Sequence, residues 1–151
     1  MAGRSAVTGY VLDTSVVIKW FSIRGESDLP NALQLRDELY AGKCSVTVPD
    51  LLFYEIANAL RYNPNFTGVD VQDALLSLAD MDLLVRRFDS LVSGKTLELA
   101  YRFGITVYDA CFLALAKTEE MNLVTADYKF FRQAQGAGNI VRLDELHSDT
   151  N

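Results

Sequence analysis

Four acidic residues occupy positions where a carboxylate is hard to explain by exposure to solvent alone. Asp13 directly follows the apolar run 10–12, Asp127 follows the run 123–126, and Asp109 opens a long apolar stretch with helical spacing. Aspartate is also a favoured helix N-cap, where it accepts a backbone N–H for about 1 kcal/mol. That structural role is open to each of the three aspartates.

Glu55 lies inside a helix expected over 50–61, and the spacing places it on a largely apolar face. The residues that share this face at i±3, i±4 and i+7 are Leu51, Leu52, Ala59 and Tyr62. An unpaired ionised carboxylate pointing inward costs several kcal/mol, so it must meet a cation or become protonated. The cation is either an arginine, with Arg61 and Arg102 as candidates, or a metal ion.

A metal ion explains all four positions with one mechanism. Hard divalent ions such as Mg²⁺ and Mn²⁺ take oxygen ligands, and they relieve the repulsion between carboxylates gathered at one place. Such ions also activate water and stabilise the transition state of phosphodiester hydrolysis. We therefore interpret four residues as a combined catalytic and metal-binding set: Asp13, Glu55, Asp109 and Asp127.

The elements that must position these residues alternate along the chain. The patterning predicts strands over 10–12, 45–48, 84–88, 123–125 and 140–143. It predicts helices over 16–20, 29–41, a segment opened by Pro49 and running to 61, 69–82, 90–103, 108–121 and 128–135. Strands separated by helices indicate an α/β fold with a central, mainly parallel sheet and helices on both faces. Ligands in such folds bind beyond the carboxyl ends of the strands, where Asp13 and Asp127 lie.

Composition narrows the chemistry. The 151 residues fit a single domain with a formal net charge of −6, and no apolar run suits a membrane span or a secretory signal, so we expect a cytoplasmic protein. The only histidine, His147, lies in a polar tail, which argues against histidine-based triads and histidine-rich zinc sites. Cys44 and Cys111 match no metal spacing and are expected to be small buried hydrophobes.

Four segments carry a resemblance to a known family. The segments 12–18 (LDTSVVI), 55–60 (EIANAL), 106–116 (TVYDACFLALA) and 123–127 (LVTAD) resemble the four acidic motifs of PIN domains, in order and with similar spacing. The match spans about 9–146, which leaves 1–8 and 147–151 as flexible tails. The resemblance implies a Rossmann-like sheet and Mg²⁺- or Mn²⁺-dependent hydrolysis of RNA to 5′-phosphate and 3′-hydroxyl ends, with the four acids as ligands.

The same resemblance suggests supporting residues and partners. Thr14 and Thr125 match hydroxyl positions of the family that orient carboxylates or water, and Asn58 lies one helical turn from Glu55, where it either serves the pocket or faces solvent. Small PIN proteins are similar to VapC toxins, which are homodimers neutralised by an antitoxin protein. We expect such contacts on helices 29–41 and 69–83. The basic residues expected to meet substrate phosphates are Lys19, Lys129 and Arg132.

Other interpretations remain open. A PIN-like scaffold without catalysis needs none of this chemistry, although it has no physical reason to keep like charges together. A dehalogenase-type phosphatase needs an aspartate at position 15, which is Ser15, and a P-loop ending at Gly94 needs glycine where Asp89 stands. Several aromatic residues either stack on RNA bases or pack in the core: Tyr54, Tyr62, Tyr108, Phe130 and Phe131. The acidic net charge indicates that few phosphates are contacted and that binding depends weakly on salt.

Overall fold

The computed structural model describes residues 7–146 of the chain. The predicted tail at 147–151, with His147, lies outside this part, as do residues 1–6 of the tail predicted at 1–8.

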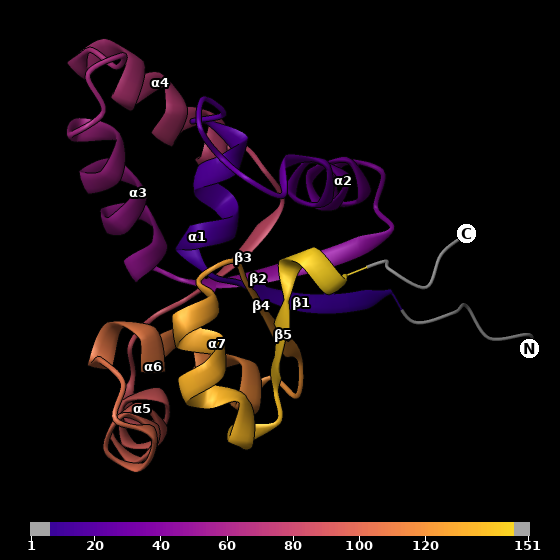
Figure 1. Ribbon diagram of the computed structural model, residues 1–151, viewed down its shortest axis with the longest axis vertical. Helices are drawn as coiled ribbons and strands as arrows, with labels where there is room; N and C mark the ends of the chain where they lie inside the picture. Colours follow the sequence, from indigo (N-terminus) through magenta and orange to yellow (C-terminus); the bar gives the residue numbers. More distant parts are fainter. Residues whose placement is uncertain (1–6, 147–151) are drawn as a thin grey trace, which may run out of the picture.

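A five-stranded parallel sheet forms the centre of the molecule, in the order β3-β2-β1-β4-β5 (Figure 1). Its strands are β1 (Thr8–Leu12), β2 (Cys44–Pro49), β3 (Leu83–Arg86), β4 (Asn122–Thr125) and β5 (Ile140–Arg142). Every neighbouring pair is parallel, which confirms the predicted fold class. The chain first builds outward from β1 through β2 to β3 and then returns to the other side of β1. The order therefore reverses between β1 and β4, the place where α/β folds leave a crevice at the strand ends.

The helices cover both faces of the sheet, and Figure 1 shows the first four on one side and the last three on the other. The first group consists of α1 (Thr14–Val17), α2 (Leu29–Tyr40), α3 (Leu51–Arg61) and α4 (Gly68–Ala79), with the 3₁₀ turn η1 (Ile18–Trp20) after α1. The second group consists of α5 (Ser90–Phe103), α6 (Val107–Thr118) and α7 (Tyr128–Ala134). Two further 3₁₀ turns, η2 (Gln135–Ala137) and η3 (Leu143–Glu145), flank β5.

Helix α6 is the centre of the packing on its side of the sheet. All residues from Ala110 to Ala116 are buried, and the helix packs on β1, β2 and β4. A helix that is apolar on nearly every side cannot face solvent, so its position is fixed by the core. Taken alone, no helix within residues 7–146 has the length and hydropathy to cross a membrane; α5 and α6 reach that threshold only as a pair, bent by 119°.

Two local predictions were wrong. Pro49 does not open the helix: it is the buried last residue of β2, paired with Arg86, and α3 begins at Leu51 after the N-cap Asp50. The segment 16–20 is not one α-helix, because the α-helical turn ends at Val17 and continues as η1. Gly104, by contrast, ends α5 in the left-handed region at φ 63°, as predicted.

Two glycines near each other offer a matched test of this helix. Gly104→Ala should lower the free energy of unfolding by about 1–2 kcal/mol, because a Cβ disfavours positive φ. Gly94→Ala, inside α5 with open space around its Cβ position, should raise it by about 0.5–1 kcal/mol. Urea denaturation followed by circular dichroism measures both, and a gain in stability for Gly104→Ala would contradict this account of the helix end.

Candidate active site

The carboxyl ends of β1 and β4 open into a polar cavity of 310 Å³, which we call the acid pocket. Its lining residues are Asp13, Thr14, Ser15, Glu55, Asn58, Ala59, Asp109 and Asp127. They come from the turn after β1, from α3, from the start of α6 and from the turn after β4. The structure thus brings together all four acids that the sequence singled out, although they are as much as 114 positions apart (13 to 127).

Asp13 is the most buried of the four, with 5% of its surface exposed. Its Oδ2 accepts hydrogen bonds from Ser15 Oγ at 2.6 Å and from Thr125 Oγ1 at 2.9 Å. Burial raises the pKa of this carboxyl group to about 6, and the charges of Asp109 and Glu55 push it in the same direction. Its polar partners within residues 7–146 are hydroxyls only, which stabilise the charge less than a cation does.

Ser15 is a site residue that the sequence reasoning missed. Besides donating to Asp13, its Oγ accepts the backbone N–H of Ala126 at 2.9 Å and lies 3.3 Å from Thr125 Oγ1. It therefore ties the end of β1 to the end of β4 directly beneath the acid pocket. A hydroxyl two residues after Asp13 was visible in the sequence, but its role depends on β4 lying next to β1.

Glu55 lies at the side of α3, half-buried, where Thr14 Oγ1 donates a hydrogen bond to its Oε1 at 2.6 Å. The predicted inward face of α3 was wrong: the buried residues are Leu52, Ile56 and Leu60, and Tyr62 is 74% exposed. Glu55 precedes Ile56 by one residue, so it flanks this buried stripe instead of sharing it.

The alternative arginine partners of Glu55 do not pair with it. Arg61 lies over the ring of Tyr62 and Arg102 over that of Phe103. In the described part of the chain, Glu55 forms no salt bridge with either.

The two remaining acids differ in their local roles. Asp127 Oδ1 accepts the N–H of Phe130 at 3.1 Å, so Asp127 is the N-cap of α7 as well as a pocket residue. Asp109 is not a cap, because Thr106 fills that role in α6. Burial raises the pKa of Asp109 to about 6, and Asp127 and Glu55 contribute by repulsion. Asp13 occupies the N-cap position of α1, but its side chain accepts no cap hydrogen bond. A side-chain N-cap role therefore accounts for Asp127 and does not account for Asp13 or Asp109.

The other candidate residues divide into those at the site and those away from it. Asn58 is exposed and lines the acid pocket. Lys129 lines a neighbouring cavity of 320 Å³ that shares Asp109 and Asp127 with the acid pocket. Arg132 is exposed and lines neither cavity. Lys19 is buried and pairs with Glu26 at 2.8 Å, so the structure does not bring it to the acids.

The donor set fits a hard divalent cation. All of its charged groups are carboxylates, and within residues 7–146 none of them is neutralised by a lysine or arginine. The four side chains line the pocket but do not converge: within residues 7–146, no three or more Asp, Glu, His or Cys side chains are placed so that they could hold a metal ion together. Mutual repulsion keeps such groups apart until a cation offsets their charge.

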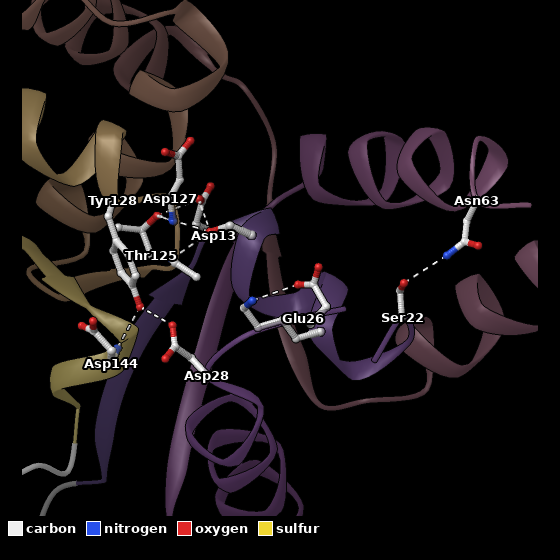
Figure 2. A network of polar contacts seen from close by, with 12 residues as sticks. Asp13, Ser22, Glu26, Asp28, Asn63, Thr125, Asp127, Tyr128 and Asp144 are labelled. Atoms are coloured by element: carbon white, nitrogen blue, oxygen red, sulfur yellow. Dashed lines mark hydrogen bonds and ion pairs between the residues drawn. The ribbon is translucent and has the colours of Figure 1, made fainter. Parts of the chain in front are cut away.

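A second polar network holds the start of α7, which carries Asp127. Tyr128 OH donates to Asp28 Oδ2 at 2.8 Å and accepts the backbone N–H of Asp144 at 3.1 Å, as Figure 2 shows. The guanidinium of Arg142 lies 4.0 Å from the ring of Tyr128 and also pairs with Asp144. Figure 2 also shows Thr125 bonded both to Asp13 and to the N–H of Asp127. Asp127 is thus held on one side by Thr125, two residues before it, and on the other side by the contacts of Tyr128, the residue after it.

Comparison with models of protein families gives one match. The model of the PIN domain family matches residues 10–136. Among solved structures, the chain is similar to a toxin-antitoxin complex from Klebsiella pneumoniae, with a TM-score of 0.67 and 19% identity, covering 89% of this chain and 97% of that one. It is similar to PAE2754 from Pyrobaculum aerophilum, with a TM-score of 0.67 and 18% identity over 95% of both chains.

A third similar structure is VapC20 from Mycobacterium tuberculosis, titled a sarcin-ricin loop cleaving toxin. Its TM-score is 0.66 at 17% identity, with 86% of this chain and 95% of that chain covered. At these identities the likenesses show the fold. Curated protein sequences give no match.

The burial of Asp13 predicts a pH dependence of the metal-free protein. The pKa of its carboxyl group is about 6 in the folded protein, against a usual value of 3.8. Between these two pH values the folded state therefore binds more protons than the unfolded state. The free energy of unfolding should fall as the pH rises through this range, by at most roughly 3 kcal/mol at 1.36 kcal/mol per unit. Asp13→Asn should remove the part of the slope due to this residue and leave the part due to Asp109, whose pKa burial also raises to about 6. Urea denaturation in EDTA at several pH values tests this, and an unchanged profile would exclude Asp13 as its source.

We expect the hydroxyl group of Tyr128, apart from its ring, to contribute to the stability of the fold. Tyr128→Phe should lower the free energy of unfolding by about 1–2 kcal/mol, because the Asp28 carboxylate and the Asp144 N–H lose their partner. Tyr101→Phe is the matched control: its side chain is 88% exposed, and the change should cost less than about 0.5 kcal/mol. Equal effects in the two variants would refute a structural role for the Tyr128 hydroxyl.

Proposed function

The chain belongs to the PIN domain family, and on this premise we propose that it is a metal-dependent ribonuclease that hydrolyses RNA to 5′-phosphate and 3′-hydroxyl ends. The acid pocket is the observation that carries the proposal. Asp13 and Asp109 are carboxylates with raised pKa values and no cationic partner in the described chain, at the sheet edge where ligands bind. A bound divalent cation offsets the repulsion among these carboxylates, and its positive charge then serves catalysis.

In this proposal the ion is Mg²⁺ or Mn²⁺, held by Asp13, Glu55, Asp109 and Asp127 directly or through water. When bound, it supplies positive charge for the phosphate and acidity for the attacking water. The chain's own residues do the rest. Thr14, Ser15 and Thr125 orient carboxylates through the hydrogen bonds described above.

Two further side chains face the substrate in this proposal. Lys129, beside Asp109 and Asp127, binds a substrate phosphate as an ammonium group. Asn58 offers an amide at the rim of the acid pocket. Neither side chain makes the ion unnecessary, because neither offsets the repulsion among the four acids on its own.

We further propose that the protein is a cytoplasmic VapC-type toxin, a homodimer that an antitoxin protein neutralises. The similar structure from K. pneumoniae is titled a toxin-antitoxin complex, and VapC20 is titled a toxin that cleaves the sarcin-ricin loop. Exposed apolar side chains support protein contacts, and the largest group of them lies on or near α5 and the start of α6: Phe88, Leu91, Leu97, Tyr101, Val107 and Tyr108. Fewer are on the helices that the sequence favoured, with Tyr40 on α2, and Val69 and Leu76 on α4.

The proposal predicts metal-dependent cleavage that a single acid controls. The purified protein should cut labelled single-stranded or structured RNA in Mg²⁺ or Mn²⁺ and not in EDTA. Asp109→Asn should lower the rate at least about 100-fold, because charge stabilisation by a metal is worth several kcal/mol. The variant should still fold, since the change relieves repulsion within the pocket.

Asp73→Asn is the matched control, because Asp73 is exposed on α4 and takes no part in the acid pocket. It should cleave at the wild-type rate. Calorimetry should show Mg²⁺ or Mn²⁺ binding to the wild type and weaker binding to Asp109→Asn. A folded wild type that binds neither ion, or cleavage that persists unchanged in EDTA, would refute the proposal.

A further inference from the structure

A second cavity opens at the far end of the helices that form the acid pocket. It has a volume of 340 Å³ and is lined by Phe21, Ser22, Ile23, Arg24, Asn63, Asn65 and Phe66; we call it the Phe21–Phe66 pocket. Pockets that hold small organic groups begin at about 300 Å³. Nothing in the four-acid chemistry uses these residues.

The two walls of this pocket are fixed to each other. Asn63 Nδ2 donates to Ser22 Oγ at 3.0 Å, a bond visible in Figure 2. The Oδ1 of Asn63 accepts the N–H of Asn65 at 2.9 Å, and its carbonyl oxygen accepts the N–H of Phe66 at 3.0 Å. The partly buried ion pair of Lys19 with Glu26 anchors the segment that follows Arg24. A ligand would therefore enter a preformed pocket and lose little to ordering it.

The lining groups suit a nucleobase and its phosphate. Phe21 and Phe66 are half-buried and pack against the core, which holds them as rigid aromatic walls. Asn65 is exposed, and its side-chain amide forms no hydrogen bond within the described residues. Bases stack on aromatic rings, and amides recognise the edges of unpaired bases.

Arg24 adds a positive charge to the rim of the pocket. Arg24 is exposed and forms no ion pair in the described chain, whereas Lys19 is paired with Glu26. A guanidinium group binds phosphate oxygens in a forked geometry. In a protein of net charge −6, an unpaired arginine beside aromatic rings favours an anionic, aromatic ligand over an acidic or purely apolar one.

The pocket lies on a continuation of the acid pocket. Helix α3 contributes Glu55 and Asn58 to the acid pocket, and Asn63 just past its end to the Phe21–Phe66 pocket. Eight residues from Glu55 to Asn63 at 1.5 Å each correspond to about 12 Å, which a few nucleotides span. The opposite walls are also continuous, since Thr14 and Phe21 stand at the two ends of α1 and η1.

We propose that the Phe21–Phe66 pocket binds a nucleobase of the single-stranded RNA substrate, a few nucleotides from the phosphate that lies over the acid pocket. Phe21 and Phe66 stack on the base, Asn65 reads its edge and Arg24 contacts its phosphate. The inference rests on the proposed ribonuclease function and adds a specificity determinant to it. The cleavage chemistry stays with the four acids.

Binding of labelled RNA heptamers tests the proposal without cleavage, in an Asp109→Asn background. The probes are oligo(A), oligo(C), oligo(U) and a mixed sequence, and fluorescence anisotropy measures their binding.

Phe66→Leu keeps an apolar side chain but removes the ring, and it should raise the Kd of the best heptamer about tenfold. Arg24→Gln should raise the Kd several-fold at low salt and less at high salt. The matched controls are Phe103→Leu, half-buried at the end of α5, and Lys43→Gln, exposed directly before β2. Both should change the Kd less than twofold.

An abasic substitution identifies the contact. Placed at each position of the heptamer in turn, it should weaken binding about tenfold at one position. At that position it should have no further effect on Phe66→Leu, because the ring and the base are then already uncoupled. Heptamer binding that is unchanged in Phe66→Leu and Arg24→Gln would overturn the inference while leaving the ribonuclease intact. A wild type that neither binds nor cleaves RNA would overturn the proposed function, and the inference with it.

Discussion

Mutual repulsion of four carboxylates at one edge of a parallel sheet is the constraint around which this structure is arranged. Asp13 is buried, its side-chain partners within residues 7–146 are hydroxyl groups, and its raised pKa shows that the fold holds this charge at a cost. A soluble domain has only about 5–15 kcal/mol of net stability to set against such costs. The burial of β1, β4 and α6 must therefore be strong enough to keep acids together that would separate in water.

The geometry of the acids follows from how these central elements pack. Leu12 and Val124 are fully buried and paired, so the turns after β1 and β4 leave the sheet side by side. Ser15 and Thr125 then join the two turns through hydroxyl groups. These short side chains give the carboxylate of Asp13 a fixed direction and bring no positive charge to it; in the proposed function, this arrangement preorganises a site for a cation.

Much of the fold and of the acid pocket was predictable from the sequence, because alternating strand and helix patterns leave few possible sheet orders. The positions of Asp13 and Asp127 followed from their place after buried strands. The face of Glu55 and the strand position of Pro49 were mispredicted, because one-residue shifts along an element decide burial and no local pattern fixes them. Ser15 was missed for a different reason: its partners Thr125 and Ala126 are 110 and 111 positions away. Only tertiary structure makes such a residue part of the site.

The acidic net charge is compatible with an RNA substrate once the distribution of the basic residues is considered. Several are held in ion pairs, including Lys19 with Glu26, Arg86 with Glu119 and Arg142 with Asp144. Two that form no ion pair in the described chain line separate cavities: Lys129 lines the one that shares Asp109 and Asp127 with the acid pocket, and Arg24 lines the Phe21–Phe66 pocket. Attraction is then local, and each phosphate contact on a single strand changes the salt slope by only about 0.7. A divalent ion in the acid pocket would offset two of the four negative charges that lie there. In the proposed function, such a surface would select RNA by where its few positive groups lie, and the overall charge of the protein would have little part in that selection.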